Sequence, residues 1–455
     1  MKKKSRMKSV HLIPLSFLVV IVIGTYLLQL PISTASGEGT DTITALFTAT
    51  TSVCVTGLVV VDTFSYWSIF GQVVIVLLIQ IGGLGVVTVG GLLMMARKMK
   101  FSLGDRALLE DSLNVDRKRE VKSFLSRIIR GVLCVEAVGA GLYAIEFVPL
   151  LGVFKGIWAS IFHSVSAFCN AGMDVVGPNS MIDFNHSPLL MIVTMVLIVL
   201  GGIGFVVWID VVDSVKTGLK RNYSLKLMIR RISEHTKLVI LLTLALIVVG
   251  ATIVFVAEYN NPATIGGMEF GDKILNSFFQ SVTWRTAGFA SVPQAELTDV
   301  TIVVGCIFMF IGGSPIGTAG GVKTVTAFLF FANAVSYIIG RQETVIFNRR
   351  VTAERMRKAA AIVFVSMGIA LIMTLLLLSR GGMDLTAALY EVFSAIGTVG
   401  VSKGLTPNLD GIGRLIIILS MYLGRIGPIS MAFVFSGENN ISNKIRHSEG
   451  NFYVG

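Results

Sequence analysis

The chain has 455 residues, of which 53% are hydrophobic and only 14% are charged, and its mean hydropathy is +0.78. Soluble globular proteins carry about 25% charged residues, so this composition excludes an ordinary soluble domain and indicates a membrane protein. The net charge of +11 comes without a separate basic domain, so nucleic-acid binding is not expected. No CxxC, Cys/His cluster, HExxH or Ser/His/Asp set is present, so we expect neither an enzyme nor an organic cofactor.

The first apolar stretch follows a basic segment, Lys2–Lys8, that resembles the start of a signal peptide. The run over 12–30 is long enough to cross a bilayer core of about 30 Å, and no small-residue cleavage site follows it. We therefore expect it to be retained as the first transmembrane helix. In chain order, the eight stretches long enough to span are 11–30, 69–95, 128–150, 188–212, 237–257, 301–338, 359–379 and 411–435.

Between the two spans of each pair lies a shorter and more polar segment, of a length that suits a re-entrant helix. These segments are 41–56, 155–171, 271–287 and 384–399. Each leads into the same kind of phrase, whose glycines are 115, 116 and 112 residues apart. The four phrases contain Val55, Thr56 and Gly57; Asn170, Ala171 and Gly172; Thr286, Ala287 and Gly288; and Thr398, Val399 and Gly400.

Four such loops around one axis can form a ring of backbone carbonyls, which replaces the hydration shell of an ion. Glycine permits the backbone conformations that aim carbonyls at the axis. The C-terminal dipole of each preceding short helix would favour a cation. Ion permeation is therefore the leading hypothesis from the residues alone.

The second span of each unit repeats a glycine phrase in phase with the loops: GGLG at 82–85, GGIG at 201–204, GGSP at 312–315 and GRIG at 424–427. In the third unit five glycines and one proline fall within ten residues, which should break a helix. Broken backbone at membrane depth is tolerated where it is buried in protein or lines a water-filled cavity. We interpret the stretch as a gate rather than a static kink, because the other three spans lack it. Its residues are Gly312, Gly313, Ser314, Pro315, Ile316, Gly317, Thr318, Ala319, Gly320 and Gly321.

Two charged residues inside spans are assigned to the same region. Arg425 takes the place of the second glycine in the fourth phrase, and a charge within a span is costly and usually functional or paired. Arg425 either faces the pathway or pairs with Glu391 or a loop carbonyl. Lys323 either caps carbonyls of the broken helix or lines the inner pathway.

Charge predicts the orientation, because cytoplasmic loops carry an excess of Lys and Arg. The termini and the connectors between units hold 30 of these residues, the regions between the two spans of each unit hold six, and Lys323 and Arg425 lie within spans. Both termini are therefore expected in the cytoplasm. The predicted units are 1–95, 128–215, 237–340 and 359–435, joined by an amphipathic connector at 96–127 and by connectors at 216–236 and 341–358, with a tail at 436–455.

Together these features resemble the Trk/Ktr/HKT superfamily of potassium transporters, and most of all the bacterial KtrB-type membrane subunit. The resemblance rests on the four loop glycines, the broken third inner span and Arg425. It implies an all-α pseudo-fourfold pore in the bacterial plasma membrane, with eight transmembrane helices and four re-entrant pore helices. It also implies K⁺ at a filter of the four phrases, a homodimer, stimulation by Na⁺, and a cytosolic nucleotide-binding regulatory ring of KtrA type. Some relatives with serine at the first filter position prefer sodium, whereas glycine in all four copies favours potassium.

A secondary symporter of a small solute is the alternative, since such proteins also use repeats and broken helices. Their repeats usually number two and are often inverted. Four repeats that run in the same direction and contain re-entrant loops argue against this alternative.

Overall fold

The computed structural model describes residues 3–86, 88–91 and 121–427. Most of the predicted connector at 96–127 and the whole tail at 436–455 lie outside these residues. Apart from one two-stranded hairpin, β1 (Val345–Ile346) paired with β2 (Arg349–Arg350), the regular structure described is helical.

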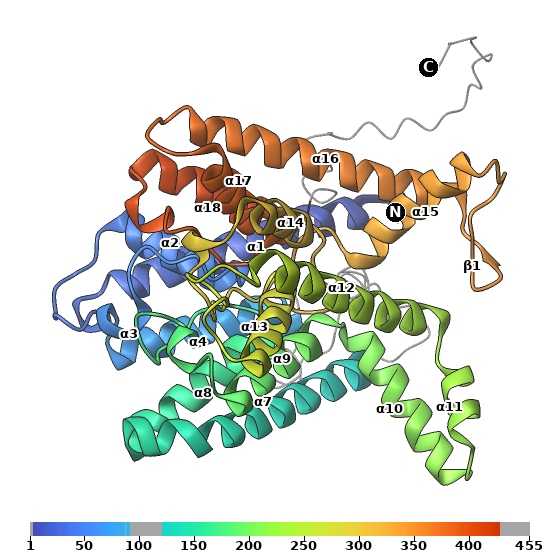
Figure 1. Cartoon of the computed structure of the whole chain (residues 1–455), viewed down its shortest axis with the longest axis horizontal. Coiled ribbons are helices and arrows are strands. Elements are labelled where there is room, and N and C mark those ends of the chain that lie inside the picture. Colours follow the sequence, from blue (N-terminus) through green and yellow to red (C-terminus); the bar gives the residue numbers. More distant parts are fainter. Residues whose placement is uncertain (1–2, 87, 92–120, 428–455) are drawn as a thin grey trace.

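Each of the four units contains a long first helix, a short buried helix and a further apolar helix (Figure 1). The first helices are α1 (Lys3–Gln29), α7 (Val121–Leu151), α12 (Glu234–Glu258) and α16 (Ala353–Leu378). The short helices are α2 (Thr42–Cys54), α8 (Val153–Cys169), α13 (Phe270–Thr283) and α17 (Leu385–Gly397). The further helices are α4 (Ile69–Leu84), α9 (Pro188–Gly202) with α10 (Phe205–Lys220), α14 (Asp299–Phe310) with α15 (Thr324–Ile338), and α18 (Gly411–Ile426).

Small elements connect these helices. They are α3 (Thr63–Tyr66), α11 (Leu225–Arg231) and four single turns of 3₁₀ helix, at Pro31–Ser33, Ile182–Phe184, Gln294–Glu296 and Thr406–Asn408. In Figure 1 the chain between α10 and α12 and the β1–β2 hairpin lie at one end of the molecule, and α3 lies at the other.

Local sequence signals explain where the helices of the fourth unit begin. Asp384 accepts a hydrogen bond from the N–H of Thr386 at the start of α17, and Asp410 accepts one from Gly413 at the start of α18. Such caps satisfy N–H groups that have no partner within the helix. The Gly413 N–H and the Arg380 guanidinium hold the pKa of Asp410 below its usual value. The ionised carboxylates of Asp384 and Asp410 therefore stabilise the helices that they cap.

The further helix is interrupted in the first three units, which corrects the predicted continuous spans at 188–212 and 69–95. Helices α9 and α10 meet at an angle of 98°. The last glycines of the phrases in units one, two and four share one backbone conformation: Gly85 has φ 86° and ψ 130°, Gly204 has 96° and 136°, and Gly427 has 85° and 146°. Only glycine adopts such angles readily, so the last glycine of each phrase ends its helix. An interruption is thus common to the first three units, and the third differs in the length of its loop.

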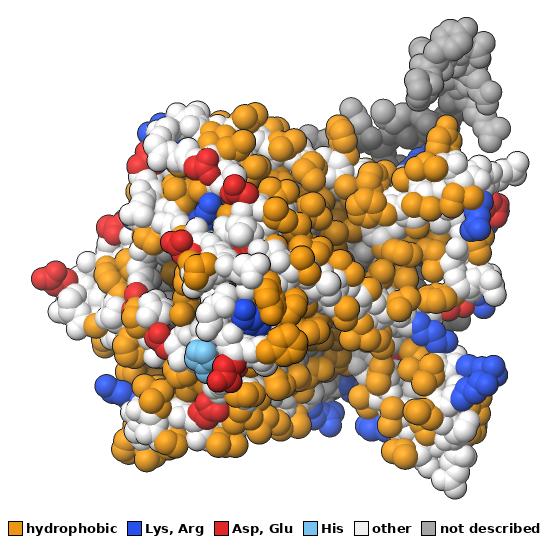
Figure 2. All heavy atoms as spheres, viewed as in Figure 1, with side chains coloured by type: hydrophobic (Ala, Val, Ile, Leu, Met, Phe, Trp, Pro, Cys, Tyr) orange, Lys and Arg blue, Asp and Glu red, His pale blue; other side chains and the backbone are white. Residues whose placement is uncertain are grey.

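Among the described residues, four helices are long and apolar enough by themselves to cross a bilayer: α1 over Leu12–Gln29, α7 over Ser123–Leu151, α12 and α16. The bent pair α9 and α10 passes the same test as a fifth span. These helices leave apolar side chains on the surface, such as Phe364, which is 81% exposed. Figure 2 shows apolar side chains across the middle of the visible face, with most acidic side chains at one end. This arrangement is that of a helical membrane protein.

Candidate functional site

The four repeated phrases share one backbone conformation. The second residue before each glycine is in the left-handed region, with φ of 55° at Val55, 62° at Asn170, 75° at Thr286 and 51° at Thr398. The glycines themselves have φ of 96° at Gly57, 64° at Gly172, 85° at Gly288 and 107° at Gly400. Left-handed Val and Thr are true outliers, because β-branched side chains clash there. Strain of this kind persists only where the surroundings fix it, and it is concentrated at functional sites.

The four glycines surround a common centre and leave no space for side chains. A Cβ atom built on each glycine would lie less than 3 Å from the carbonyl oxygen of the residue before the glycine in another unit. These approaches close into a ring: Gly57 to Ala171, Gly172 to Ala287, Gly288 to Val399, and Gly400 to Thr56. The structure therefore brings all four predicted phrases together, with their carbonyl groups in close succession.

A buried hydroxyl group braces three of the phrases in the same way. The N–H of Gly57 donates to Thr51 Oγ1 at 3.0 Å, that of Met173 to Ser166 Oγ at 3.1 Å, and that of Gly400 to Ser394 Oγ at 2.9 Å. Each hydroxyl residue stands six positions before its phrase glycine. These braces were not predicted, although an alignment of the four units on their glycines would have revealed the position.

The third phrase differs from the others. Helix α13 ends five residues before Gly288, whereas the other short helices end three residues before their glycines. Thr283 donates to the carbonyl oxygen of Phe289 instead of accepting from an N–H group. The extra residues hold Trp284 and Arg285, which are both buried. Arg285 donates to the carbonyl oxygen of Thr243 on α12, so it is directed away from the ring of carbonyls.

The first glycine of the helix phrase lets each apolar helix approach its own short helix. A Cβ on Gly82, Gly201 or Gly424 would overlap the carbonyl oxygen of Val53, Phe168 or Ile396 respectively. Each of those carbonyls belongs to the residue four positions before the phrase glycine. The loop phrase and the helix phrase are therefore two sides of one repeated contact, which explains why they recur in phase.

The ring offers oxygen atoms and no charged ligand. Thr56 and Thr398 are fully buried, and neither side-chain hydroxyl has a partner among the described residues. Neutral oxygen ligands of this kind suit a hard cation such as an alkali ion. No group of three or more His, Cys, Asp or Glu side chains in the described ranges could hold a tightly bound metal.

The predicted gate stretch lies against the second unit. The N–H groups of Ser314 and Thr318 donate to the carbonyls of Gly202 and Gly201 at 2.9 and 3.1 Å. The N–H of Phe205 donates to Ile316 at 2.9 Å. The stretch therefore fills the break between α9 and α10, and three of its backbone polar groups form hydrogen bonds there.

The same stretch also contacts the ring of phrases. Thr318 Oγ1 lies 3.0 Å from the side-chain amide of Asn170. A Cβ built on Gly320 would overlap the side chain of Thr398. Two of the four phrases are thus in direct contact with the stretch.

Arg425 and Lys323 both bind backbone carbonyls. Arg425 donates to the carbonyl oxygens of Thr318 and Gly82 at 2.5 Å each, and so links the fourth unit to the gate stretch and to the first unit. Glu391 is occupied elsewhere, because it accepts from the hydroxyls of Ser402 and Thr406. The pairing with a loop carbonyl, which the sequence left open, is therefore the one observed. Lys323 donates to Ala319 at 2.6 Å, in agreement with the capping alternative.

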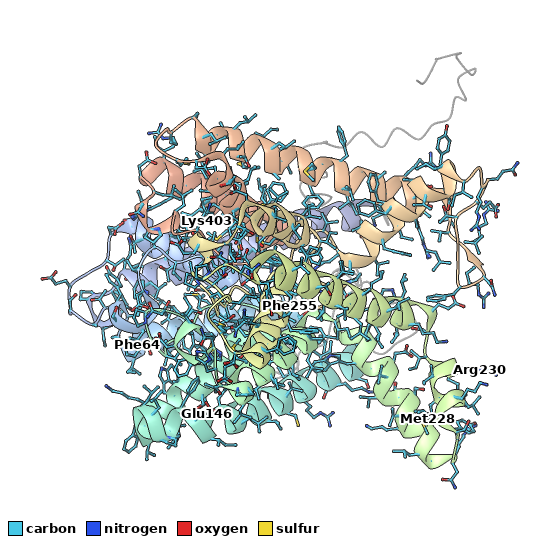
Figure 3. All side chains as sticks on the ribbon, in the orientation of Figure 1. Phe64, Glu146, Met228, Arg230, Phe255 and Lys403 are labelled. Atoms are coloured by element: carbon cyan, nitrogen blue, oxygen red, sulfur yellow. The ribbon has the colours of Figure 1, made fainter. Side chains whose placement is uncertain are left out.

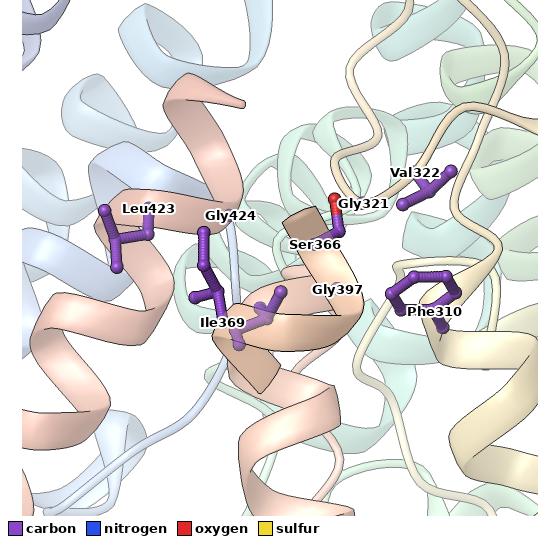
Figure 4. A pocket seen from close by; sticks show the side chains of 9 residues that line it. Phe310, Gly321, Val322, Ser366, Ile369, Gly397, Leu423 and Gly424 are labelled. Carbon is purple, nitrogen blue, oxygen red and sulfur yellow. The ribbon is translucent and has the colours of Figure 1, made fainter. Parts of the chain in front are cut away.

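A cavity of about 20 Å³ lies behind the gate stretch, between the third and fourth units (Figure 4). Phe310 and Val322 line it on one side, Ile369 and Leu423 on the other, and Ser366 contributes its one polar side chain. The volume could hold one water molecule, but such a water needs two to four polar partners. The cavity therefore leaves local free space beside Val322, at the C-terminal end of the gate stretch.

A family model named TrkH and described as a cation transport protein matches residues 4–444. The chain belongs to the TrkH family. It is 37% identical over 445 residues to the Ktr system potassium uptake protein B of Bacillus subtilis, covering 98% of this chain and 96% of that protein. It is 35% identical over 439 residues to the potassium/sodium uptake protein NtpJ of Enterococcus hirae, covering 95% of this chain and 94% of that protein.

The crystal structure of the potassium transporter TrkH from Vibrio parahaemolyticus has the same fold. The TM-score is 0.70 at 16% sequence identity, and the match covers 92% of this chain and 84% of that one. The predicted family is therefore confirmed, and this TrkH family member is a helical membrane protein of a cation transporter family.

Proposed function

We propose that this protein takes up potassium ions across the bacterial plasma membrane through the ring of four phrases. The observation that carries the proposal is the closed succession of glycines and carbonyls from all four units. Carbonyl oxygens compensate for the lost hydration of an ion without adding charge. The two relatives named above are both described as potassium uptake proteins, one of them also for sodium.

In this proposal the backbone of twelve residues supplies the K⁺ sites, namely Val55 to Gly57, Asn170 to Gly172, Thr286 to Gly288 and Thr398 to Gly400. The short helices α2, α8, α13 and α17 act as pore helices, and their C-terminal dipoles favour a cation. The apolar helices complete eight membrane crossings around a pseudo-fourfold axis. The cytoplasm is assigned to the end with α11 and the β1–β2 hairpin, where both termini would also lie.

We further propose that residues 312–321 gate this pathway. The stretch contacts two phrases of the ring, and Arg425 holds it by the Thr318 carbonyl. The cavity beside Val322 provides local space for its C-terminal end to shift. Lys323, bound to Ala319, anchors the same end of the stretch.

The remaining proposals follow the resemblance to KtrB-type subunits, and the Ktr system named for the Bacillus subtilis relative supports a partner component. They are a homodimer, a cytosolic nucleotide-binding regulatory ring that docks on the cytoplasmic face, and stimulation of uptake by sodium. Co-purification of the full chain with a candidate regulator, followed by mass measurement of the complex, tests the first two. A complex with a single membrane chain would contradict the dimer.

Cation flux into proteoliposomes that hold the purified chain tests the main proposal. We expect K⁺ and Rb⁺ to enter well above Na⁺, and empty liposomes give the background. Entry of Na⁺ equal to that of K⁺ would contradict a potassium filter. If no cation enters, the measurement is repeated with the regulator bound, and a second negative result would favour the solute symporter.

A further inference from the structure

We infer that Glu136 is a proton-binding site in the middle of the membrane. Its ionised form strengthens potassium binding where the first and second units pack against each other. This inference rests on the proposed function. Glu136 lies fifteen residues from each end of α7, a helix long and apolar enough to cross a bilayer. An ionisable side chain at such depth is costly, and it usually faces the protein interior and marks a functional site.

Glu136 is nearly unexposed and incompletely satisfied. Only 6% of the residue is exposed, and its Oε1 atom has no hydrogen-bond partner among the described residues. Its Oε2 atom accepts a hydrogen bond from Gln80 Nε2 at 3.3 Å. One amide contact is too little for a buried carboxylate, because an uncompensated buried charge costs several kcal/mol or is neutralised.

No basic side chain compensates this charge in the described part of the chain. Helices α4 and α9 contain no Asp, Glu, Lys, Arg or His. On α8 the ionisable residues are Lys155, which is exposed near the start of the helix, His163 and Cys169. On α7 itself, Arg127 and Arg130 are exposed near the N-terminal end and Glu146 lies near the C-terminal end. A proton is therefore the simplest neutralising group for Glu136. When the carboxyl group loses this proton, a negative charge lies between the first and second units.

A short path of contacts leads from this carboxyl group to the ring. Gln80 on α4 accepts from Cys169 Sγ at 3.5 Å, and Cys169 precedes Asn170 of the second phrase. The Glu136 backbone is also fixed, because Ser164 of α8 donates to its carbonyl at 2.7 Å. A negative charge at this place attracts cations.

The test measures potassium binding to the purified full chain by thermal unfolding, titrating KCl against choline chloride at pH 6 and at pH 9. We expect the half-saturating K⁺ concentration of the wild type to fall by about three- to tenfold at the higher pH, as one partly screened charge is added. Glu136→Gln should keep the weaker affinity at both pH values. Glu146→Gln, on the same helix, should behave as the wild type does.

A charge swap separates a charge effect from a structural one. In the double variant Gln80→Glu with Glu136→Gln, one carboxyl and one amide still face each other, so the pH response should return. Glu136→Asp, which keeps a carboxyl group, should also respond to pH. A Glu136→Gln protein with the wild-type pH response would overturn the inference, as would a swap that folds without restoring it. If K⁺ stabilises the wild type at neither pH, the proposed potassium site itself fails, and the inference fails with it.

Discussion

At the scale of single residues, the site depends on backbone geometry more than on side-chain chemistry. The sequence predicted the four glycines because their spacing is visible without any structure. It did not predict the left-handed conformation of Val55 and Thr398, since β-branched residues normally avoid that region. It also missed the braces from Thr51 and Ser394, because a single hydroxyl residue in a short helix becomes recognisable only when the units are aligned on their glycines.

Gly288→Ser is expected to reduce the preference for K⁺ over Na⁺. Gly288 has φ of 85°, and its Cβ would lie 2.6 Å from the carbonyl oxygen of Val399, so that carbonyl must move. We expect the K⁺ to Na⁺ flux ratio in proteoliposomes to fall by about tenfold, equivalent to roughly 1.4 kcal/mol of lost discrimination. Gly381→Ser is the control, because Gly381 has a similar φ of 76° but nothing within 4 Å of its Cβ. Unchanged selectivity in the Gly288 variant would remove the filter assignment.

At the scale of the elements, the sequence located the helices and failed at their interruptions. The runs over 188–212 and 69–95 were predicted as continuous spans, because Gly204 and Gly85 occur among strongly apolar neighbours. At the break between α9 and α10, Gly201 lies against the Phe168 carbonyl of α8, and the gate stretch donates hydrogen bonds to the carbonyls of Gly201 and Gly202. Hydropathy reports burial in lipid and carries no information about such contacts.

Gly201→Ala is expected to destabilise the protein. The added Cβ would overlap the carbonyl oxygen of Phe168, which belongs to the backbone and cannot rotate away. Forcing a group into a packed interior costs about 1–3 kcal/mol, so the midpoint of thermal unfolding in detergent should fall by several degrees. Gly141→Ala, in the middle of α7, has free space at its Cβ and should leave the midpoint unchanged or raise it. Equal midpoints for the two variants would show that the close approach at Gly201 has no energetic importance.

Deletion of residues 313–320 is expected to raise the cation flux. It removes the backbone contacts to Gly201 and Gly202 and the contact with Asn170, and so opens the region next to two phrases. Arg425→Gln is a milder companion variant, because it removes the charge-assisted bonds to Thr318 and Gly82 without shortening the chain. We expect initial rates of K⁺ entry several-fold above the wild type for both. If both variants reconstitute as intact proteins and conduct no faster, the stretch is a static kink.

At the scale of the whole molecule, charge and apolar surface together predict the orientation in the membrane. Figure 3 shows Arg230 and Met228 of α11 at the end opposite to Phe64, Glu146 and Lys403. The first end carries the basic connectors predicted to be cytoplasmic. The sequence could predict this distribution because the placement of Lys and Arg relative to apolar runs is a one-dimensional property. It could not predict which units touch, since the ring of phrases depends on the packing of all four.

The orientation can be tested with a membrane-impermeant thiol reagent on intact cells. Cys134 is the one exposed cysteine among the four, so the background protein carries Cys134→Ala and the three others stay buried. Glu38→Cys, in the exposed segment between α1 and α2, should be labelled from outside. Arg341→Cys, exposed just after α15, should be labelled only after the membrane is made permeable, since basic connectors remain in the cytoplasm. Labelling of Arg341→Cys in intact cells, with Glu38→Cys protected, would show that the molecule has the opposite orientation. The phrases would then open from the cytoplasmic side, and the proposed regulatory ring would have no surface on which to dock.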